Sequence, residues 1–219
     1  METLRGVVFD MDGVVIDSHP AHRRAWKAFL QSLDRQTSDE ELDFILDGCK
    51  RAEILKHFLG DLSPEQITEY GRKKDELLQQ HNHTVQPIPG VIDFLGHLLK
   101  AGMSTGLATS ASRRRALGTL EELGLAGYFQ TIVTGDDVNT GKPDPALYKL
   151  AAERMQESPK RLLAIEDAAS GVKSARAAGM RCLGVAPAPR AHLLQAAGAD
   201  PVIRDFQSFS LSQMAAYFR

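Results

Sequence analysis

Two carboxylates stand one residue apart where an apolar run ends near the N-terminus. In RGVVFDMDGVVID, residues 5–17, the run over residues 7–9 is followed by Asp10, then by Asp12 and Gly13. Carboxylates this close repel each other, and a cation removes that repulsion. Asp is also common in ordinary turns, so the pair by itself allows a structural interpretation as well.

Three further apolar runs lead into polar side chains of complementary kinds. LATS ends in Thr109 and Ser110, another run leads into TGDDVNTGKPDP with Lys142, and LLAIED ends in Glu166 and Asp167. Taken singly, these residues suit a helix cap or a solvated loop. Taken together, they predict a carboxylate cluster with one lysine and a hydroxyl. Such an all-oxygen set suits Mg²⁺, which keeps several waters and binds substrate phosphate.

The elements that must position these residues alternate regularly after residue 88. Apolar runs predict strands, and 3.6-residue periodicity predicts the helices between them. The expected strands are 104–109, 131–135, 162–167, 182–186 and 201–205, and the expected helices are 91–101, 116–125, 145–155, 170–179 and 191–198. This alternation predicts an α/β fold, a doubly wound (Rossmann-like) parallel sheet covered on both faces. Ligands bind such sheets beyond the carboxyl ends of the strands.

Residues 16–87 have a different pattern, with helical periodicity and no convincing strand. We therefore expect a Rossmann-like core of residues 1–15 and 88–219, with a small α-helical cap, residues 16–87, inserted after the first strand. The linkers are expected near VIDS and in the Pro-rich TVQPIPG. Asp17, at the first linker, is expected to cap the helix that follows.

The four motifs DMDGVV, LATS, GKPDP and AIEDAASGVKSARAAG resemble, in this order, those of the haloacid dehalogenase superfamily. The closest resemblance is to its helical-cap branch, which holds β-phosphoglucomutase and many small sugar-phosphate phosphatases. It spans essentially the whole chain. It implies a Mg²⁺-dependent enzyme that transfers phosphoryl groups through an aspartyl phosphate.

The resemblance also implies roles for the first motif. Asp10 would be the nucleophile, kept ionised because Mg²⁺ and Lys142 lower its pKa. Asp12 would be the general acid and then the general base, and its backbone carbonyl would contact the metal.

The other motifs would complete the site. Asp167 would join Asp10 and Asp12 as a metal ligand, with Glu166 as a second ligand or an outer partner. Thr109, Ser110 and Lys142 would bind the phosphoryl oxygens.

Further matches, most of them in the insert, concern substrate binding. His22 matches the cap histidine of β-phosphoglucomutase, Arg51 the cap arginine that holds a distal phosphate, and Lys73 roughly a cap lysine. Ser112 resembles a core residue at the same phosphate. Asp47 departs from the pattern, because the mutase has a basic residue there.

Composition excludes several other classes of protein. The net charge of −2 does not suit a nucleic-acid binder, no apolar stretch approaches membrane-spanning length, and two distant cysteines fit a reducing cytoplasm. We expect a cytoplasmic monomer or weak homodimer whose partner is a small phosphorylated metabolite.

Four functions remain as hypotheses. The first is a phosphatase of a small phosphorylated metabolite such as a sugar phosphate, and the second is a β-phosphoglucomutase-like phosphomutase. A dehalogenase is disfavoured because those enzymes lack the second aspartate, Asp12. A non-catalytic binding module is disfavoured because every motif residue is present.

Overall fold

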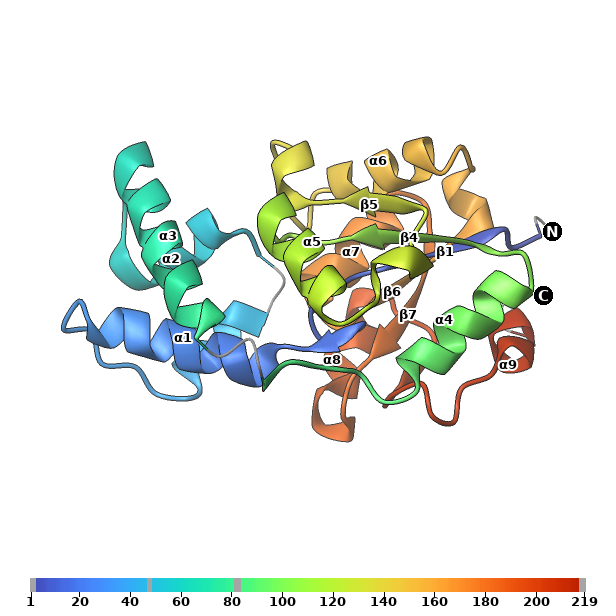
Figure 1. Ribbon diagram of the computed structural model, residues 1–219, viewed down its shortest axis with the longest axis horizontal. Coiled ribbons are helices and arrows are strands. Elements are labelled where there is room, and N and C mark those ends of the chain that lie inside the picture. Colours follow the sequence, from blue (N-terminus) through green and yellow to red (C-terminus); the bar gives the residue numbers. More distant parts are fainter. Residues whose placement is uncertain (1–2, 47–48, 81–83, 217–219) are drawn as a thin grey trace.

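A six-stranded parallel sheet forms the centre of the larger part of the molecule (Figure 1). The computed structural model describes residues 3–46, 49–80 and 84–216. In sheet order the strands are β5 (Thr131–Val133), β4 (Ser104–Ala108), β1 (Gly6–Phe9), β6 (Leu162–Glu166), β7 (Arg181–Val185) and β8 (Val202–Ile203). The predicted α/β fold with a doubly wound parallel sheet is confirmed.

Helices cover both faces of this sheet because successive strand residues point to opposite sides. Val7 and Phe9 pack into one apolar cluster with α4, α5 and α9, whereas Val8 packs into another with α6, α7 and α8. The bounds are α4 Val91–Lys100, α5 Arg113–Glu122, α6 Ala146–Arg154, α7 Ala169–Ala177, α8 Ala188–Ala197 and α9 Leu211–Ala216.

A helical part lies beside the carboxyl edge of the sheet (Figure 1). It comprises α1 (His19–Gln31), the 3₁₀ helix η1 (Glu41–Leu46), α2 (Arg51–Leu59) and α3 (Pro64–Gln79). It has its own apolar cluster, which includes Trp26, Phe29 and Leu55. An antiparallel ribbon of β2 (Ile16–Asp17) and β3 (Gln86–Pro87) joins it to the core. These features support a cap at residues 16–87, which remains a prediction.

The structure corrects two details of the sequence interpretation. Asp17 does not cap the first cap helix: it lies in β2 opposite Gln86, and Ser18 is the residue that precedes α1. Helix α9 and the β2–β3 ribbon were not predicted, because two- or six-residue elements are too short to show a period. Among the described residues, no helix is both long and apolar enough to cross a bilayer.

The strand register places the candidate site residues side by side at the same edge of the sheet. Phe9 in β1 lies opposite Leu107 in β4 and opposite Ile165 in β6. The residues after these, Asp10 and Glu166 among them, therefore emerge side by side at the carboxyl edge. This is the edge that faces the cap helices (Figure 1).

Candidate active site

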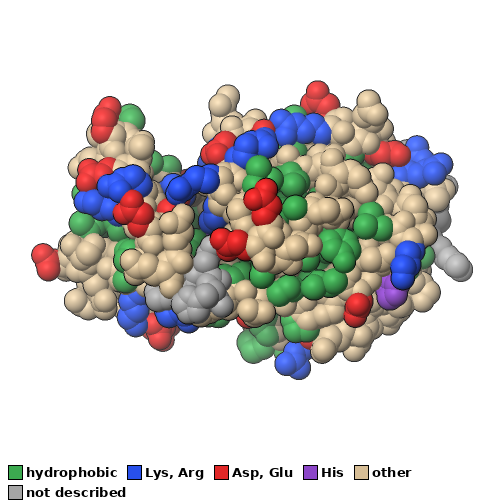
Figure 2. Space-filling model, in the orientation of Figure 1, with side chains coloured by type: hydrophobic (Ala, Val, Ile, Leu, Met, Phe, Trp, Pro, Cys, Tyr) green, Lys and Arg blue, Asp and Glu red, His purple; other side chains and the backbone are tan. Residues whose placement is uncertain are grey.

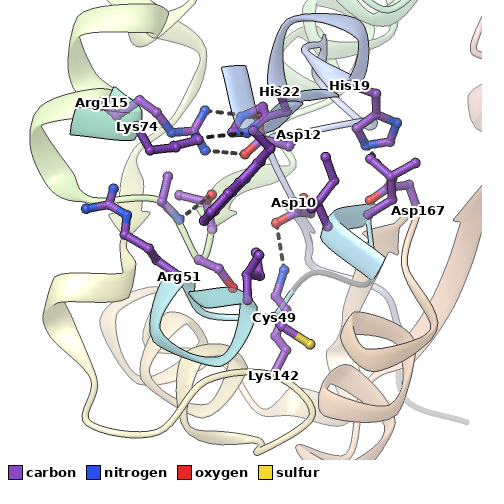
Figure 3. A pocket seen from close by; sticks show the side chains of 17 residues that line it. Asp10, Asp12, His19, His22, Cys49, Arg51, Lys74, Arg115, Lys142 and Asp167 are labelled. Atoms are coloured by element: carbon purple, nitrogen blue, oxygen red, sulfur yellow. Dashed lines mark hydrogen bonds and ion pairs between the residues drawn. The ribbon is translucent and has the colours of Figure 1, made fainter. Parts of the chain in front are cut away.

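A cavity of about 100 Å³ lies between the carboxyl edge of the sheet and the cap helices. The space-filling view shows an indentation between the two parts, with Lys and Arg side chains beside it (Figure 2). From the core, the cavity is lined by Asp10, Asp12, Thr109, Ser110, Ala111, Arg115, Lys142 and Asp167; from the cap, by His19, His22, Trp26, Ile45, Leu46, Cys49, Arg51, Ile54 and Lys74 (Figure 3). Both parts therefore contribute charged groups to one cavity.

Asp10 lies at the floor of this cavity, directly after β1. Its backbone N–H donates to the carbonyl of Ile165 at 2.9 Å, which fixes the residue at the sheet edge. The Nζ of Lys142 lies 2.6 Å from Oδ1 of Asp10 (Figure 3) and 2.5 Å from Oε1 of Glu166. Tyr148 donates its hydroxyl to the same oxygen of Glu166 at 2.7 Å. Lys142 is thus aimed at Asp10 by a fully buried carboxylate.

The pKa of Asp10 differs in part from the expectation that Mg²⁺ and Lys142 lower it. Burial raises the pKa of Asp10 well above its usual range, and the carboxylates of Glu166, Asp167 and Asp12 add to this, against the attraction of Lys142. The lysine alone is therefore insufficient to hold the pKa of Asp10 down. Lys142 itself stays protonated: burial would lower its pKa, but Asp10 and Glu166 raise it overall.

Three buried carboxylates form a set with metal-ligand spacing. One oxygen each from Asp10, Glu166 and Asp167 lies within 4.8 Å of the others. Hard oxygen donors of this kind suit Mg²⁺. A divalent cation would also offset the repulsion that raises the pKa of Asp10. The donor set therefore fits the predicted metal.

Asp12 faces the cap side of the cavity and has partners on both oxygens. Arg115 donates Nη1 to Oδ1 at 3.0 Å and Nη2 to Oδ2. Ser18 donates its hydroxyl to Oδ1 at 2.5 Å. Burial alone would raise the pKa of Asp12, but Arg115 and the nearby His22 lower it well below its usual range. In this conformation Asp12 is held as a carboxylate.

His22 and Lys74 form a buried polar pair next to Asp12. The Nζ of Lys74 lies 3.1 Å from Nδ1 of His22, and Nε2 of His22 lies 3.6 Å from Oδ1 of Asp12, too far for a hydrogen bond. Burial, together with Lys74, lowers the pKa of His22 to about 3. Burial, together with Arg115, lowers the pKa of Lys74 to about 7. His22 is therefore neutral near pH 7.

His19 was not recognised from the sequence, and it contacts the predicted metal site. Its Nε2 lies 3.0 Å from Oδ2 of Asp167 (Figure 3). Burial would lower the pKa of His19, but Asp167 raises it overall. The two side chains meet over Gly13, which has a φ of +76° and where a Cβ would lie 2.2 Å from Asp167. The spacing of His19 and His22, three residues apart on one helix face, was the available signal.

The structure brings most of the predicted site residues together. Those that line the cavity are Asp10, Asp12, His22, Arg51, Thr109, Ser110, Lys142 and Asp167, with Glu166 buried behind them. Ser112 does not line it; its hydroxyl caps α5 by accepting from the N–H of Arg115. A phosphate contact by Ser112 therefore has no support from the geometry.

Two details of the cap differ from the sequence interpretation or lie beyond the structure. Lys73 pairs with Glu69 at 2.8 Å and does not line the cavity, whereas the next residue, Lys74, does. The structure therefore does not place Lys73, the rough match to a cap lysine, at the cavity. Asp47 lies outside the described residues.

The model of the family described as haloacid dehalogenase-like hydrolase matches residues 7–185. The chain is 33% identical to a phosphorylated carbohydrates phosphatase of Thermotoga maritima over 81% of its length and 82% of that protein. It is 31% identical to β-phosphoglucomutase of Bacillus subtilis over 95% of its length and 92% of that protein. The crystal structure of β-phosphoglucomutase from Clostridium difficile shares the fold, with a TM-score of 0.89 at 20% identity, covering 99% of this chain and 97% of that one.

Proposed function

The chain belongs to the haloacid dehalogenase-like hydrolase family and is an enzyme, and we propose that it is a Mg²⁺-dependent phosphatase of a small phosphorylated metabolite such as a sugar phosphate. One observation carries the proposal. Asp10 lies at the end of a central parallel strand, 2.6 Å from a buried lysine and within a set of three carboxylates, in a cavity lined by both parts of the chain. This arrangement suits a nucleophilic carboxylate that must approach a phosphoryl group.

In the first half of the reaction, a carboxylate oxygen of Asp10 attacks phosphorus. The P–O bond to the metabolite breaks as the bond to Asp10 forms, and Asp12 gives a proton to the departing oxygen. Lys142 and the hydroxyl of Thr109 stabilise the charge on the phosphoryl oxygens. Thr109 is buried, lines the cavity and accepts from the N–H of Ala111 at 3.1 Å.

In the second half, water attacks the phosphorus bound to Asp10. Asp12, now a carboxylate, takes the proton from that water, and phosphate leaves as Asp10 is restored. The side chains of Asp10, Asp167 and Glu166 would hold Mg²⁺, which supplies positive charge that neutralises the phosphoryl oxygens. The cap side chains would exclude bulk water and contact the organic part of the substrate.

A β-phosphoglucomutase-like activity is the second candidate, favoured by His22 and Arg51, which both line the cavity. In that case a sugar hydroxyl replaces water in the second half-reaction. The ion pairs made by the two arginines of the cavity favour the phosphatase. Arg51 already binds Asp75 at 2.7 Å, and Arg115 already binds Asp12, so a second phosphate would have to displace a carboxylate from either guanidinium.

The proposal is tested by assaying phosphate release from a panel of sugar, polyol and carboxylic-acid phosphates with Mg²⁺. Free phosphate is expected from at least one ester, with loss of turnover in Asp10→Asn while the circular dichroism spectrum is retained. Activity that survives in Asp10→Asn would contradict the assigned nucleophile.

The two candidates are separated by supplying β-glucose 1-phosphate with a trace of β-glucose 1,6-bisphosphate. A phosphatase yields free phosphate, whereas a mutase yields glucose 6-phosphate, which a coupled dehydrogenase detects. Glucose 6-phosphate formed without free phosphate would replace the first candidate with the second.

A further inference from the structure

Asp12 is not positioned to act while Arg115 holds it. The guanidinium contacts both carboxylate oxygens, and Ser18 contacts one of them as well. A carboxyl that gives a proton to a leaving oxygen needs one oxygen turned to the substrate and not engaged by a cation. The Arg115–Asp12 pair must therefore open during turnover, and a guanidinium whose side chain is 15% exposed needs another acceptor.

A second buried carboxylate has an unused acceptor. Oδ2 of Asp75 accepts from Arg51 at 2.7 Å, but Oδ1 is buried and has no hydrogen-bond donor among the described residues. The ammonium of Lys74 lies 3.9 Å from that oxygen, too far for a hydrogen bond. A buried acceptor left without a donor is energetically unfavourable. Oδ1 of Asp75 is thus a vacant position for a donor.

A second cavity connects Arg115 to this position. It has a volume of about 260 Å³ and lies between α3 and α5, with both Asp75 and Arg115 in its lining. Arg115 also lines the first cavity, so its side chain forms a partition between the two. Burial alone would lower the pKa of Arg115, but the charges of Asp12 and Asp75 raise it overall.

We propose that Arg115 exchanges partners during turnover, leaving Asp12 for the vacant oxygen of Asp75 and returning when the product has left. This inference rests on the proposed phosphatase reaction. It makes Arg115 and Asp75 positioning residues, since they act on the reaction through Asp12. No covalent bond changes in the exchange, and the guanidinium remains paired with a carboxylate at both ends of its movement.

The other acidic residue of the second cavity is a weaker partner. Glu122 lies in α5 with Arg115 and is exposed to solvent, where an ion pair contributes little. Asp75 belongs to the cap, and its side chain is only 14% exposed. The exchange therefore ties the release of Asp12 to the position of the cap relative to the core.

The kinetic test compares two esters in Asp75→Asn. Fructose 1-phosphate has an alkoxide leaving group that needs a proton from Asp12, whereas p-nitrophenyl phosphate has an acidic phenol that needs little help. The loss of kcat/KM is expected to be at least about tenfold larger for fructose 1-phosphate, because general acid catalysis contributes on the order of 10²–10⁴-fold. Equal losses for the two esters, or no loss for either, would overturn the exchange.

A matched set of double variants excludes a role of Asp75 through Arg51. In Arg115→Met, the further change Asp75→Asn is expected to have little additional effect, because no guanidinium remains to move. In Arg51→Met, the same change is expected to keep its full effect. The reverse pattern would assign the effect of Asp75 to its contact with Arg51 and refute the exchange.

A crystal structure tests the exchange of partners by Arg115 without any measurement of turnover. In a crystal structure with Mg²⁺ and beryllium fluoride, an analogue of the phosphoryl group on Asp10, Arg115 is expected within hydrogen-bond distance of Oδ1 of Asp75. Arg115 still bound to Asp12 there would overturn the proposal. A wild-type chain that releases phosphate from no ester of the panel would instead contradict the proposed function, so the two failures are distinguishable.

Discussion

The ammonium of Lys142 lies 2.5 Å from Oε1 of Glu166, and the two side chains are at most 2% exposed. The glutamate also accepts the hydroxyl of Tyr148. Its position thereby directs the lysine toward Asp10, 2.6 Å away. A buried ion pair of this kind contributes little net stability, but breaking it leaves a charge without compensation.

Helix α7 leaves room for Glu166 only because residue 171 is glycine. A Cβ on Gly171 would lie 2.0 Å from Oε1 of Glu166, so Gly171→Ala is expected to push the glutamate away from Lys142. The expected loss is about 1–3 kcal/mol in the free energy of unfolding, measured by urea denaturation, together with reduced kcat.

The matched control is Gly96→Ala in α4, where a Cβ would meet nothing within 4 Å. Both changes replace a helical glycine by alanine, so both gain up to roughly 1 kcal/mol from helix propensity. The difference between them isolates the contact with Glu166. Equal stability of the two variants would show that Glu166 adapts without cost.

Mg²⁺ is expected to stabilise the folded chain, because it offsets repulsion among Asp10, Glu166 and Asp167. At about 100 times its Kd, a ligand of the native state adds about 2.7 kcal/mol to the free energy of unfolding. For a chain of this size, each kcal/mol raises Tm by roughly 2–4 °C. Differential scanning fluorimetry of EDTA-treated protein measures the shift. A shift of the same size in Asp167→Asn would argue against this site.

Lys74 is expected to make stability increase with pH. Burial, together with Arg115, lowers its pKa from 10.5 to about 7 in the folded chain, so the unfolded chain binds more protons between these values. The free energy of unfolding therefore rises from about pH 7 to about pH 10.5, by on the order of a few kcal/mol. The charged groups acting on Lys74 are Arg115, Asp75, Arg51 and Asp12.

The measurement is the difference in unfolding free energy between the wild type and Lys74→Met at several pH values in this window. The difference is expected to shift in favour of the wild type as pH rises. Parallel curves for the two proteins would mean that Lys74 keeps an ordinary pKa.

Lys50 is expected to hold the cap against the core. Its Nζ donates to the carbonyls of Val138 at 2.8 Å and Asn139 at 3.0 Å, in the loop that leads to Lys142. Lys50→Met should favour an open cap and lower kcat/KM about tenfold, since hydrogen bonds from a charged donor contribute about 1.5–3 kcal/mol each.

The control for this change is Lys56→Met in α2, the helix that begins directly after Lys50. Lys56 pairs with Asp61 at the exposed surface, 2.7 Å apart, and such pairs contribute little. Comparable loss of kcat/KM in both variants would rule out a specific role for Lys50 in closure.

The sequence allowed much of the fold to be predicted, because long elements show their periodicity locally. The strands that end near Asp10, Thr109 and Glu166 were expected within about a residue of where they lie. The β2–β3 ribbon was missed because its pairing joins residues about seventy positions apart, and two-residue strands show no alternation.

The sequence by itself determined which residue types stand at the strand ends, and therefore the metal-binding and nucleophilic character expected there. Only the tertiary structure decided the partners of these groups. Nothing local in the sequence aims Arg115 at Asp12, His19 at Asp167, or Lys74 rather than Lys73 into the cavity. Such contacts depend on how the cap packs against the core, which is set by buried surfaces that no single segment contains.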